Sequence, residues 1–279
     1  MHLNGRHPLL SRHLHQSPCA DGEMVIDARR LVFAGPLDLA GMVALAHSAR
    51  SAGKGVTLIT ADDQDITAYL QRMDVIRRMP PDTAIDGTLP AGRRAYLPHA
   101  LLEVSPLAPD TADDAGTRLG RMAAHHFADT VAAKIFAAVG ELIDNAVDHG
   151  ASPEGAFVAA QVYTGTTSGR RGFEVAICDT GVGVLAHLRR NPAHSSLPDA
   201  ARALERALHP GVTGTTDLRG NGLNDLLLHL EFGGLARFHL RSGDGLATVT
   251  VRGPRRISRL HRTMTPVTGT WAWLRIRIP

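Results

Sequence analysis

Several features that often reveal a protein's class are scarce or missing in this sequence. Only two of its 279 residues are cysteines, Cys19 in a polar segment and Cys178 in an apolar run, so we expect no disulfide framework. No apolar run approaches the roughly 18 to 20 residues that span a bilayer. The opening segment, MHLNGRHPLLSRHLHQSPCADG, lacks the apolar stretch and the small-residue cleavage site of a signal peptide. These absences predict a cytoplasmic protein with no membrane partner.

Charge of one sign is not concentrated in any part of the chain. The formal net charge is +3, and the pI is near 9.2. No block of five or six like charges occurs, and basic residues do not interleave with aromatic ones, so nucleic acid is not expected as the main ligand. With 44% hydrophobic residues, the chain can form one large domain or two modest ones, each with its own core.

The first part of the chain alternates the patterns of strands and helices. Residues 23–35 have the composition of one or two strands, and residues 38–53 that of a helix with Asp38 as its N-cap. A short buried strand and a second amphipathic helix follow before Pro80. This order predicts a small α/β unit with parallel strands. The predicted boundaries are a flexible tail over 1–22, the α/β domain over 23–80, a linker over 81–98 and a second domain over 99–279.

The second domain combines long helices with strands. Two helices with a break near Asp129 are expected before Gly150, followed by two strands around a Gly-rich turn. Two short helices and three further strands, 236–243, 245–253 and 270–279, complete the chain. Such an order describes an α+β sandwich in which helices back one sheet.

A polar face on the second long helix is the first candidate for chemistry. In AAVGELIDNAVDHG, Glu141 and Asn145 are four residues apart and Asp148 lies a further turn on. An amide oxygen can bind Mg²⁺ without adding charge, and a neighbouring carboxylate can orient or deprotonate a water molecule. The alternative is a solvated acidic face that ends at a glycine C-cap, Gly150.

Two glycine-containing motifs supply further candidates. In VAICDTGVGV, Asp179 ends an apolar strand and could accept a hydrogen bond from an exocyclic amine, while Gly181 and Gly183 allow backbone to approach a flat ring. An ordinary Asp-Thr-Gly turn is the alternative. In LRGNGLNDLLLHL, Gly220 and Gly222 precede a helix whose N-terminal N–H groups could bind an anion.

In this order the three motifs resemble those of the GHKL ATPase superfamily, which includes gyrase-type topoisomerases, Hsp90 chaperones, MutL proteins and histidine kinases. ELIDNAVDHG is similar to the N box, DTGVG to the first glycine box and RGNGL to the second. GTWAWLRIRIP resembles the last strand of kinase-like members. The resemblance covers about Leu101 to Pro279. It implies a Bergerat-type two-layer α/β sandwich, with a mixed sheet backed by helices, that binds ATP or ADP with Mg²⁺.

The resemblance also implies a role for each motif residue. Asn145 would ligate Mg²⁺, and Glu141 would be the base that activates water or a hydroxyl group. Asp179 would accept the adenine amino group, with Gly181 and Gly183 lining the base. The other implied cofactor-binding residues are Asp148, His149, Arg219, Gly220, Gly222, Leu223 and Thr270, with 185–219 as the ATP lid.

Some of these residues have a second interpretation. His149 could reach a phosphate or cap the end of its helix, and Arg189, Arg190 and Arg219 could meet phosphate or be solvated surface residues. The second glycine box departs from the fuller kinase form, because Asn224-Asp225 stands where another glycine often occurs. Because of this departure, the resemblance does not imply the family's lid geometry or fast turnover.

The strand and helix order of the first domain resembles that of a STAS domain, the fold of anti-sigma-factor antagonists. Those antagonists carry a phosphorylatable Ser or Thr at the start of the first helix. Here neither occurs between Arg29 and Ser48, and Asp38 stands near that place with a permanent negative charge. The resemblance implies a docking or nucleotide-sensing module and not a phospho-switch.

The combined expectation is a bacterial-type Mg·ATP-binding regulator in which nucleotide-dependent ordering of the lid controls a protein partner. Slow hydrolysis or Ser/Thr phosphotransfer would reset it. The main alternative is a nucleotide-binding module without chemistry. A soluble histidine kinase is less favoured, since His125-His126 lacks the neighbouring acid and downstream proline of an acceptor site. A DNA-associated ATPase is also less favoured, and a homodimer is left open.

Overall fold

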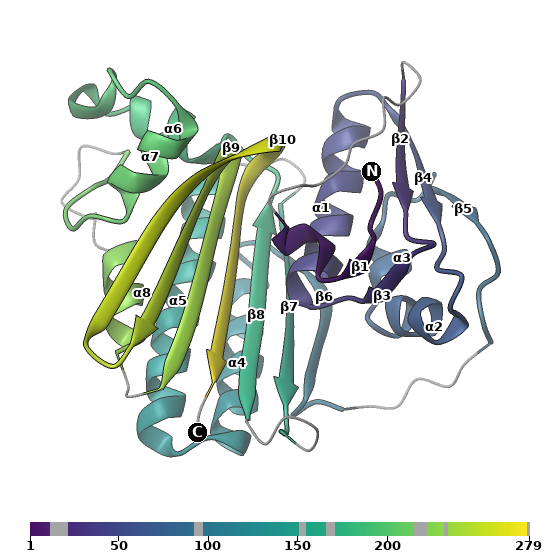
Figure 1. Ribbon diagram of the computed structural model, residues 1–279, viewed down its shortest axis with the longest axis horizontal. Helices are drawn as coiled ribbons and strands as arrows, with labels where there is room; N and C mark the ends of the chain where they lie inside the picture. The colour runs from purple at the N-terminus through teal and green to yellow at the C-terminus, as the bar shows by residue number, and fades with distance from the viewer. Residues whose placement is uncertain are drawn as a thin grey trace.

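The structure, a computed structural model, describes residues 1–11, 22–91, 97–150, 155–165, 171–214, 222–231 and 234–277. Helices and strands are mixed in the α+β manner predicted, with one large sheet and two small ones (Figure 1). Within the described residues, none of the helices has the length and apolar character needed to cross a membrane.

The large sheet has the strand order β6-β7-β8-β10-β9, and every neighbouring pair in it is antiparallel. The expectation of a mixed sheet is therefore wrong. Two helices, α4 (Ala112–His126) and α5 (Asp129–Gly150), bring the chain back to the end at which β6 finishes, so β7 runs opposite to it. The bounds of the strands are β6 (Leu101–Leu107), β7 (Ala156–Tyr163), β8 (Gly172–Asp179), β9 (Leu235–Arg252) and β10 (Arg255–Arg277).

β9 and β10 form one long hairpin that bends near its middle (Figure 1). The first half of β9 pairs with Thr270–Arg277, and its second half pairs with Arg255–Arg262. The two strands expected over 236–243 and 245–253 are thus one strand. The strand over Arg255–Arg262 was not expected, because its arginine, serine and histidine residues do not alternate with apolar ones.

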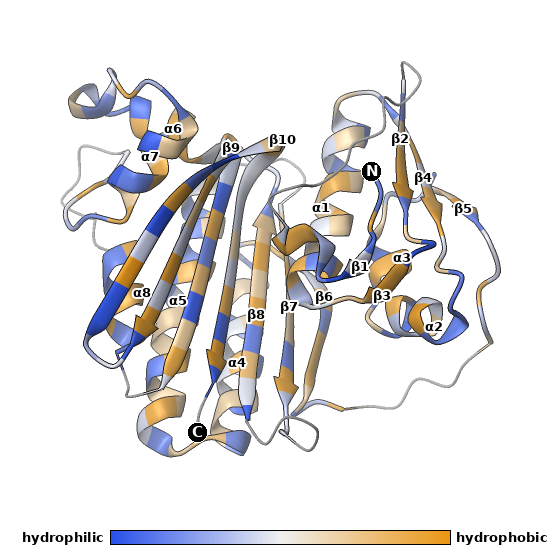
Figure 2. Ribbon diagram, viewed as in Figure 1, coloured by the Kyte–Doolittle hydropathy of each residue, from blue (hydrophilic) through white to orange (hydrophobic). Residues whose placement is uncertain are grey.

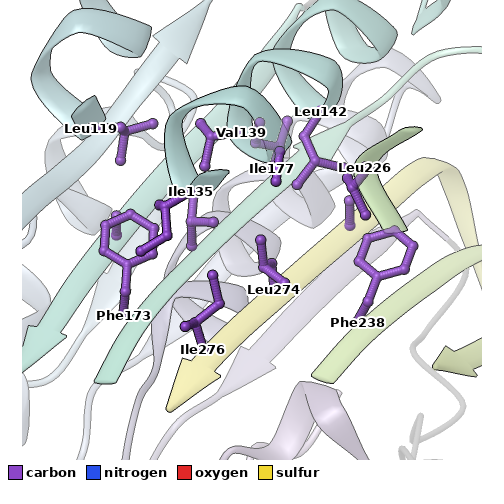
Figure 3. Close-up of a cluster of buried hydrophobic side chains, with 14 of the residues drawn as sticks. Leu119, Ile135, Val139, Leu142, Phe173, Ile177, Leu226, Phe238, Leu274 and Ile276 are labelled. Atoms are coloured by element: carbon purple, nitrogen blue, oxygen red, sulfur yellow. The ribbon is translucent and has the colours of Figure 1, made fainter. Parts of the chain in front are cut away.

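Three helices cover one face of this sheet: α4 (Ala112–His126), α5 (Asp129–Gly150) and α8 (Gly222–His229). The predicted break between the two long helices lies at Phe127–Ala128. Figure 3 shows Ile135, Val139 and Leu142 of α5 facing the inward side chains of β8 and β10. Each large apolar side chain buried in this way contributes about 1.5–3 kcal/mol. This packing fixes the orientation of α5, and with it the polar face.

The N-terminal unit contains a parallel sheet in the order β2-β4-β5, which confirms the parallel pairing predicted for it. The second predicted helix is divided in two, because Asp74 adopts a left-handed conformation (φ 59°) between its parts. The elements of this unit are β2 (Glu23–Asp27), β3 (Leu31–Phe33), α1 (Pro36–Ser51), β4 (Gly55–Ile59), α2 (Gln64–Arg72), α3 (Val75–Arg78) and β5 (Ala84–Asp86).

Residues 1–11 belong to the folded unit, so the flexible tail predicted over 1–22 is wrong for this part. β1 (Gly5–Arg6) pairs with β3, and a short 3₁₀ helix, Pro8–Leu10, follows it. Met1, Leu3 and Leu9 are buried in the core around α1. The sequence prediction missed these buried residues because histidines and arginines surround them in the sequence. Residues 12–21 lie outside the described part of the chain.

Helix α1 lies between the small parallel sheet and the outer face of the large sheet, where it contacts β7, β8 and β10. Every residue from Pro36 to Ala46 is buried. A Cβ at Gly41 would be 2.6 Å from Leu9 Cδ1 and 3.1 Å from Trp271 Cζ3, so the glycine allows this close approach. The helices back one face as predicted, but α1 adds a third layer. The two predicted domains therefore share a core.

Asp38 is fully buried, and it is not the N-cap that the sequence predicted. Its carboxylate accepts hydrogen bonds from the backbone N–H groups of Leu9 (2.8 Å) and Gly35 (2.9 Å). Gly35 is the N-cap of α1, and Asp38 occupies the third helical position. The negative charge thus stabilises the helix start inside the molecule.

Candidate functional site

A cavity of about 380 Å³ lies where α5, α8 and the end of β8 meet. It brings together polar residues that are far apart in the sequence. Glu141 comes from α5 in the helical layer, and Asp179 comes from the end of β8 in the sheet. The predicted residues that line it are Glu141, Asn145, Asp148, Asp179, Gly183, Gly222, Leu223 and Thr270.

The other predicted site residues are placed differently. Gly181 lines a second, neighbouring cavity. Arg219, Gly220 and the side chain of His149 lie outside the described residues. Arg189 lines the second cavity and donates hydrogen bonds to the Leu197 carbonyl oxygen, and Arg190 lines neither cavity. Arg189 and Arg190 of the expected lid therefore do not line the main cavity.

The polar face of α5 is turned toward the cavity because its apolar residues Val139 and Leu142 are fixed in the core. The Asn145 side-chain nitrogen donates a hydrogen bond of 2.5 Å to the Glu141 carbonyl oxygen. This bond uses the amide's donor side, so the amide oxygen is left for a ligand or a cation. The arrangement suits the Mg²⁺ role that the sequence implied for Asn145.

Glu141 is partly buried at the cavity wall. Burial raises the pKa of its carboxyl group above the usual range, and the negative charges of Asp225 and Asp144 raise it further. A carboxylate with a raised pKa is a stronger base, and its affinity for a proton is better matched to neutral pH. Asp225 belongs to the pair that replaces the expected glycine, and it also lines the cavity.

Gly222, the first residue of α8, lies directly against the polar face of α5. A Cβ at this position would be 2.8 Å from Glu141 Oε2 and 3.3 Å from Asn145 Nδ2. Contacts of that length leave no room for a side chain unless one of these groups moves. A side chain at this position would therefore displace the carboxylate of Glu141, the end of a flexible side chain, from its place in the cavity wall.

Asp179 lies at the inner end of the cavity, where it is only 4% exposed. Its Oδ1 accepts a hydrogen bond of 2.8 Å from the Gly181 N–H group. Burial raises the pKa of this carboxyl group to about 6, although hydrogen bonds from Gly181 and Thr270 act in the opposite direction. A buried acceptor at the end of an apolar strand is well placed to hold a flat, amine-bearing ring.

Ser242, which sequence reasoning missed, holds the glycine loop against the large sheet. Its hydroxyl group accepts a hydrogen bond from the Val184 N–H group (3.0 Å) and donates one to the Gly269 carbonyl oxygen (2.8 Å). Val184 lies in α6 (Gly183–Arg189), immediately after the Asp-Thr-Gly motif. No local motif marks this serine, because its role depends on the pairing of β9 with β10.

Apolar side chains that no motif indicated form much of the remaining wall. Ile177 could have been predicted from the sequence. It is two residues before Asp179 on the same strand, and side chains two residues apart on a strand point to the same face. The others depend on tertiary packing. They are Leu142, Ala146, Val184, Leu188, Ala207, Val212, Leu240 and Ala272.

The described lining is acidic. It contains the carboxylates of Glu141, Asp144, Asp148, Asp179 and Asp225, and it contains no lysine or arginine. Nowhere in the described part of the chain do three His, Cys, Asp or Glu side chains converge on a metal site. A polyphosphate would consequently need a cation that it shares with the protein. Mg²⁺ commonly binds in this way, through one or two protein oxygens and the phosphates of the ligand.

His125 and His126 are remote from this cavity. They lie at the end of α4, where the His125 and His99 rings stack with centroids 4.2 Å apart. The adjacent start of α5 at Asp129 is sixteen residues from Asn145, or about 24 Å along the helix axis at 1.5 Å per residue. These histidines cannot exchange a phosphoryl group with the cavity of the same molecule.

Neither a scan against protein-family models nor a search of curated proteins finds a match for this chain.

Proposed function

We propose that this chain is a regulatory protein of the GHKL type that binds a magnesium nucleotide in the 380 Å³ cavity. The observation that carries the proposal is the convergence of three separate motifs. Glu141 and Asn145, Asp179 and Gly222 lie on three different elements, yet all of them line the same cavity. Unrelated solvated turns and helix faces would have no reason to meet.

Each group has a task that its surroundings support. Asp179, buried among apolar residues, accepts a hydrogen bond from the amino group of the base, and the aliphatic wall excludes water from the ring. The amide oxygen of Asn145, left free by the bond to Glu141, is the protein's ligand for Mg²⁺. The bound ion would neutralise phosphate charge in this acidic cavity. Glu141, whose pKa is raised, takes a proton from the attacking water or hydroxyl group.

The N-terminal unit supports a regulatory role. Its helix α1 packs against β8 and β10, and these two strands also carry Asp179 and Thr270 of the cavity. A change in the position of either strand would thus alter both the cavity on one face of the sheet and the contact with α1 on the other. We propose that this STAS-like unit is the part that a protein partner influences, or through which the nucleotide state reaches the partner.

The experiment that tests the proposal measures ATP binding and ATP turnover in the presence of Mg²⁺, for the wild type, Asn145→Ala and Glu141→Ala. We expect the wild type to bind and slowly turn over ATP, Asn145→Ala to lose binding, and Glu141→Ala to bind without turnover. Absence of ATP and ADP binding by the wild type would exclude a nucleotide site.

A binding module without chemistry is the second candidate. It is favoured by the acidic lining, since Asp225 occupies a place at which another glycine was expected and no described cation faces the cavity. In that case the wild type and Glu141→Ala would bind nucleotide equally and neither would release phosphate, alone or with a STAS-domain partner.

A further inference from the structure

The second half of the long hairpin forms a basic edge on the large sheet. Over residues 245–262 the sequence contains five arginines and no aspartate or glutamate. Arg252 and Arg255 pair directly with one another across the hairpin, and both are exposed. In Figure 2 the outermost strand carries hydrophilic segments that alternate with hydrophobic ones. Like charges directly opposite one another destabilise a strand pair, so the edge carries an energetic cost.

The arginines are divided between the two faces of the edge. Arg256 and Arg262 are in register with Val251 and Gly245, on the face of the helical layer, and they form ion pairs with Glu231 and Asp199. The others, Arg252, Arg255 and Arg259, point to the outer face. No hydrogen bond or ion pair links these three to another described side chain.

An exposed apolar residue lies among the outer arginines. Ile257 is 57% exposed and stands between Arg255 and Arg259 on the same face of the strand. The residues opposite Ile257 and Arg259 are Thr250 and Thr248, which are small and uncharged. The outer face thus presents the alternation basic, apolar, basic along one strand. An apolar centre with arginines around it is typical of protein interfaces.

The same strand is an edge strand of the sheet as far as the described residues show. Within the described residues, Arg255–Arg262 pairs with β9 on one side, and β8 pairs only with the far half of β10, from Trp271 to Arg277. Charged residues on an edge strand protect it against pairing with a second copy. Here all these charges are positive, so they repel another copy of this chain while attracting a strand of opposite charge.

We propose that this edge binds an acidic protein partner through an extended segment, which adds to β10 as a further strand. Main-chain hydrogen bonds to the part of the strand from Arg255 to Leu260 supply affinity, and alternate side chains supply specificity. The segment that fits has acidic residues beside Arg255 and Arg259 and an apolar residue beside Ile257. The outer face of this edge carries no Phe, Tyr or Trp on which bases could stack, which favours a protein over single-stranded nucleic acid. The site is separate from the nucleotide cavity.

The test uses the full chain and a fluorescein-labelled peptide of Glu-Val repeats, with binding followed by fluorescence anisotropy. The wild type is expected to bind the peptide, and Arg255→Glu/Arg259→Glu is expected to bind it at least about tenfold more weakly. The matched control, Arg30→Glu/Arg121→Glu, reverses two exposed charges elsewhere and should remain within about twofold of the wild type. Arg255→Gln/Arg259→Gln serves if charge reversal impairs folding, which circular dichroism would report.

A second peptide separates strand addition from simple charge attraction. It has the same sequence and charge, but alternate backbone nitrogens are methylated, so that one edge cannot donate hydrogen bonds. Strand addition requires that this peptide lose most of its affinity, and equal binding of the two peptides would overturn the proposal. Failure of the Glu-Val peptide to bind the wild type would do so too. Binding of a short single-stranded oligonucleotide or of phosphatidylglycerol vesicles instead, lost in Arg255→Glu/Arg259→Glu, would assign the edge to another partner class.

Discussion

The side-chain amide of Asn145 donates its hydrogen bond to the backbone carbonyl oxygen of Glu141, one turn earlier in α5. Glu141 lies inside α5 (Asp129–Gly150), where its carbonyl oxygen is also in reach of the backbone N–H group four residues on, so the side-chain amide is an additional donor to it. At the same time it fixes the rotamer of the amide, so that the oxygen is directed away from the helix backbone. The proposed Mg²⁺ ligand is therefore held in position before any ion arrives.

Removal of this amide is expected to abolish the Mg²⁺-dependent part of nucleotide affinity. Titration calorimetry with ATP, in Mg²⁺ and again in EDTA, would show Asn145→Ala at least about tenfold weaker than the wild type in Mg²⁺ and similar to it in EDTA. Asn4→Ala, which removes an exposed amide from the N-terminal unit, is the control. An equal loss under both conditions would mean that Asn145 only shapes the cavity.

Gly222→Ala is expected to damage the site without unfolding the protein. The added methyl group would be 2.8 Å from Glu141 Oε2, so the carboxylate or α8 must shift. We expect a melting temperature within a few degrees of the wild type and a clear loss of ATP affinity or turnover. Gly140→Ala is the matched control, because a Cβ at this position in α5 has nothing within 4 Å. It should leave binding unchanged and raise stability by about 0.5–1 kcal/mol. Unchanged binding and turnover in Gly222→Ala would show that the close approach has no functional importance.

The parts of the fold that could be predicted from sequence are those in which pattern and packing agree. α5 was predicted because Val139 and Leu142 recur at helical spacing, and β8 because an unbroken apolar run ends at Asp179. The strand over Arg255–Arg262 was missed because only Ile257 and Leu260 are apolar, and its pairing depends on the preceding strand. Strand formation here follows from tertiary context and not from local propensity.

The relation between the two halves of the chain was missed for a different reason. A helix that is apolar on all sides is buried on all sides. Apart from Asp38, the segment PLDLAGMVALA is apolar all round, so the sequence already indicated a buried helix. The second layer that covers it, the outer face of β8 and β10, could not be identified without the sheet register. Asp38 was predicted as the N-cap of this helix because aspartate is common at that position, but it lies three residues beyond the actual N-cap, Gly35, and is buried.

A chain that begins at residue 99 is expected to fold poorly. Loss of α1 would uncover Phe157, Ala176, Trp271 and Trp273 on the outer face of the large sheet, all of which are now buried. Apolar patches of this kind cause aggregation. Size-exclusion chromatography and tryptophan fluorescence should show aggregates or a red-shifted emission relative to the full chain. A monomeric fragment with unshifted emission would restore the independent domain expected from the sequence.

Asp179 is expected to make stability depend on pH in the acid range. The pKa of this carboxyl group is about 6 in the folded protein, against an ordinary value of 3.8, so the folded state binds the proton more tightly than the unfolded state. The contribution to stability is therefore most favourable below pH 3.8, falls as the pH rises to about 6 and is constant above. A pKa difference of this size corresponds to about 3 kcal/mol.

Urea unfolding between pH 4 and pH 7 would reveal this term as a difference between variants. Asp179→Asn should lose less stability than the wild type as the pH rises, because its side chain does not titrate. Asp110→Asn, at an exposed carboxylate, should follow the wild type across the range. Parallel curves for all three proteins would show that Asp179 titrates normally in the folded state.

Two neighbouring tryptophans allow the buried charge beneath α1 to be tested. Trp273 Nε1 donates a hydrogen bond of 2.6 Å to Glu174 Oε1, and Glu174 is completely buried. The Nε1 group of Trp271 has no partner among the described residues, although the two rings are 3% and 2% exposed, almost equally buried. Trp→Phe removes similar apolar area at both positions, so the difference between the variants reports the hydrogen bond.

Trp273→Phe should destabilise the protein by about 1–3 kcal/mol more than Trp271→Phe, because it leaves a buried carboxylate oxygen without its donor. Denaturant unfolding at neutral pH measures both values. The excess should shrink when Glu174→Gln is combined with Trp273→Phe, since the oxygen that remains is uncharged and less costly to bury. If both tryptophans cost the same, the ion pair of Glu174 with Arg275, at 3.7 Å, is sufficient to hold the charge, and the indole N–H group contributes only packing.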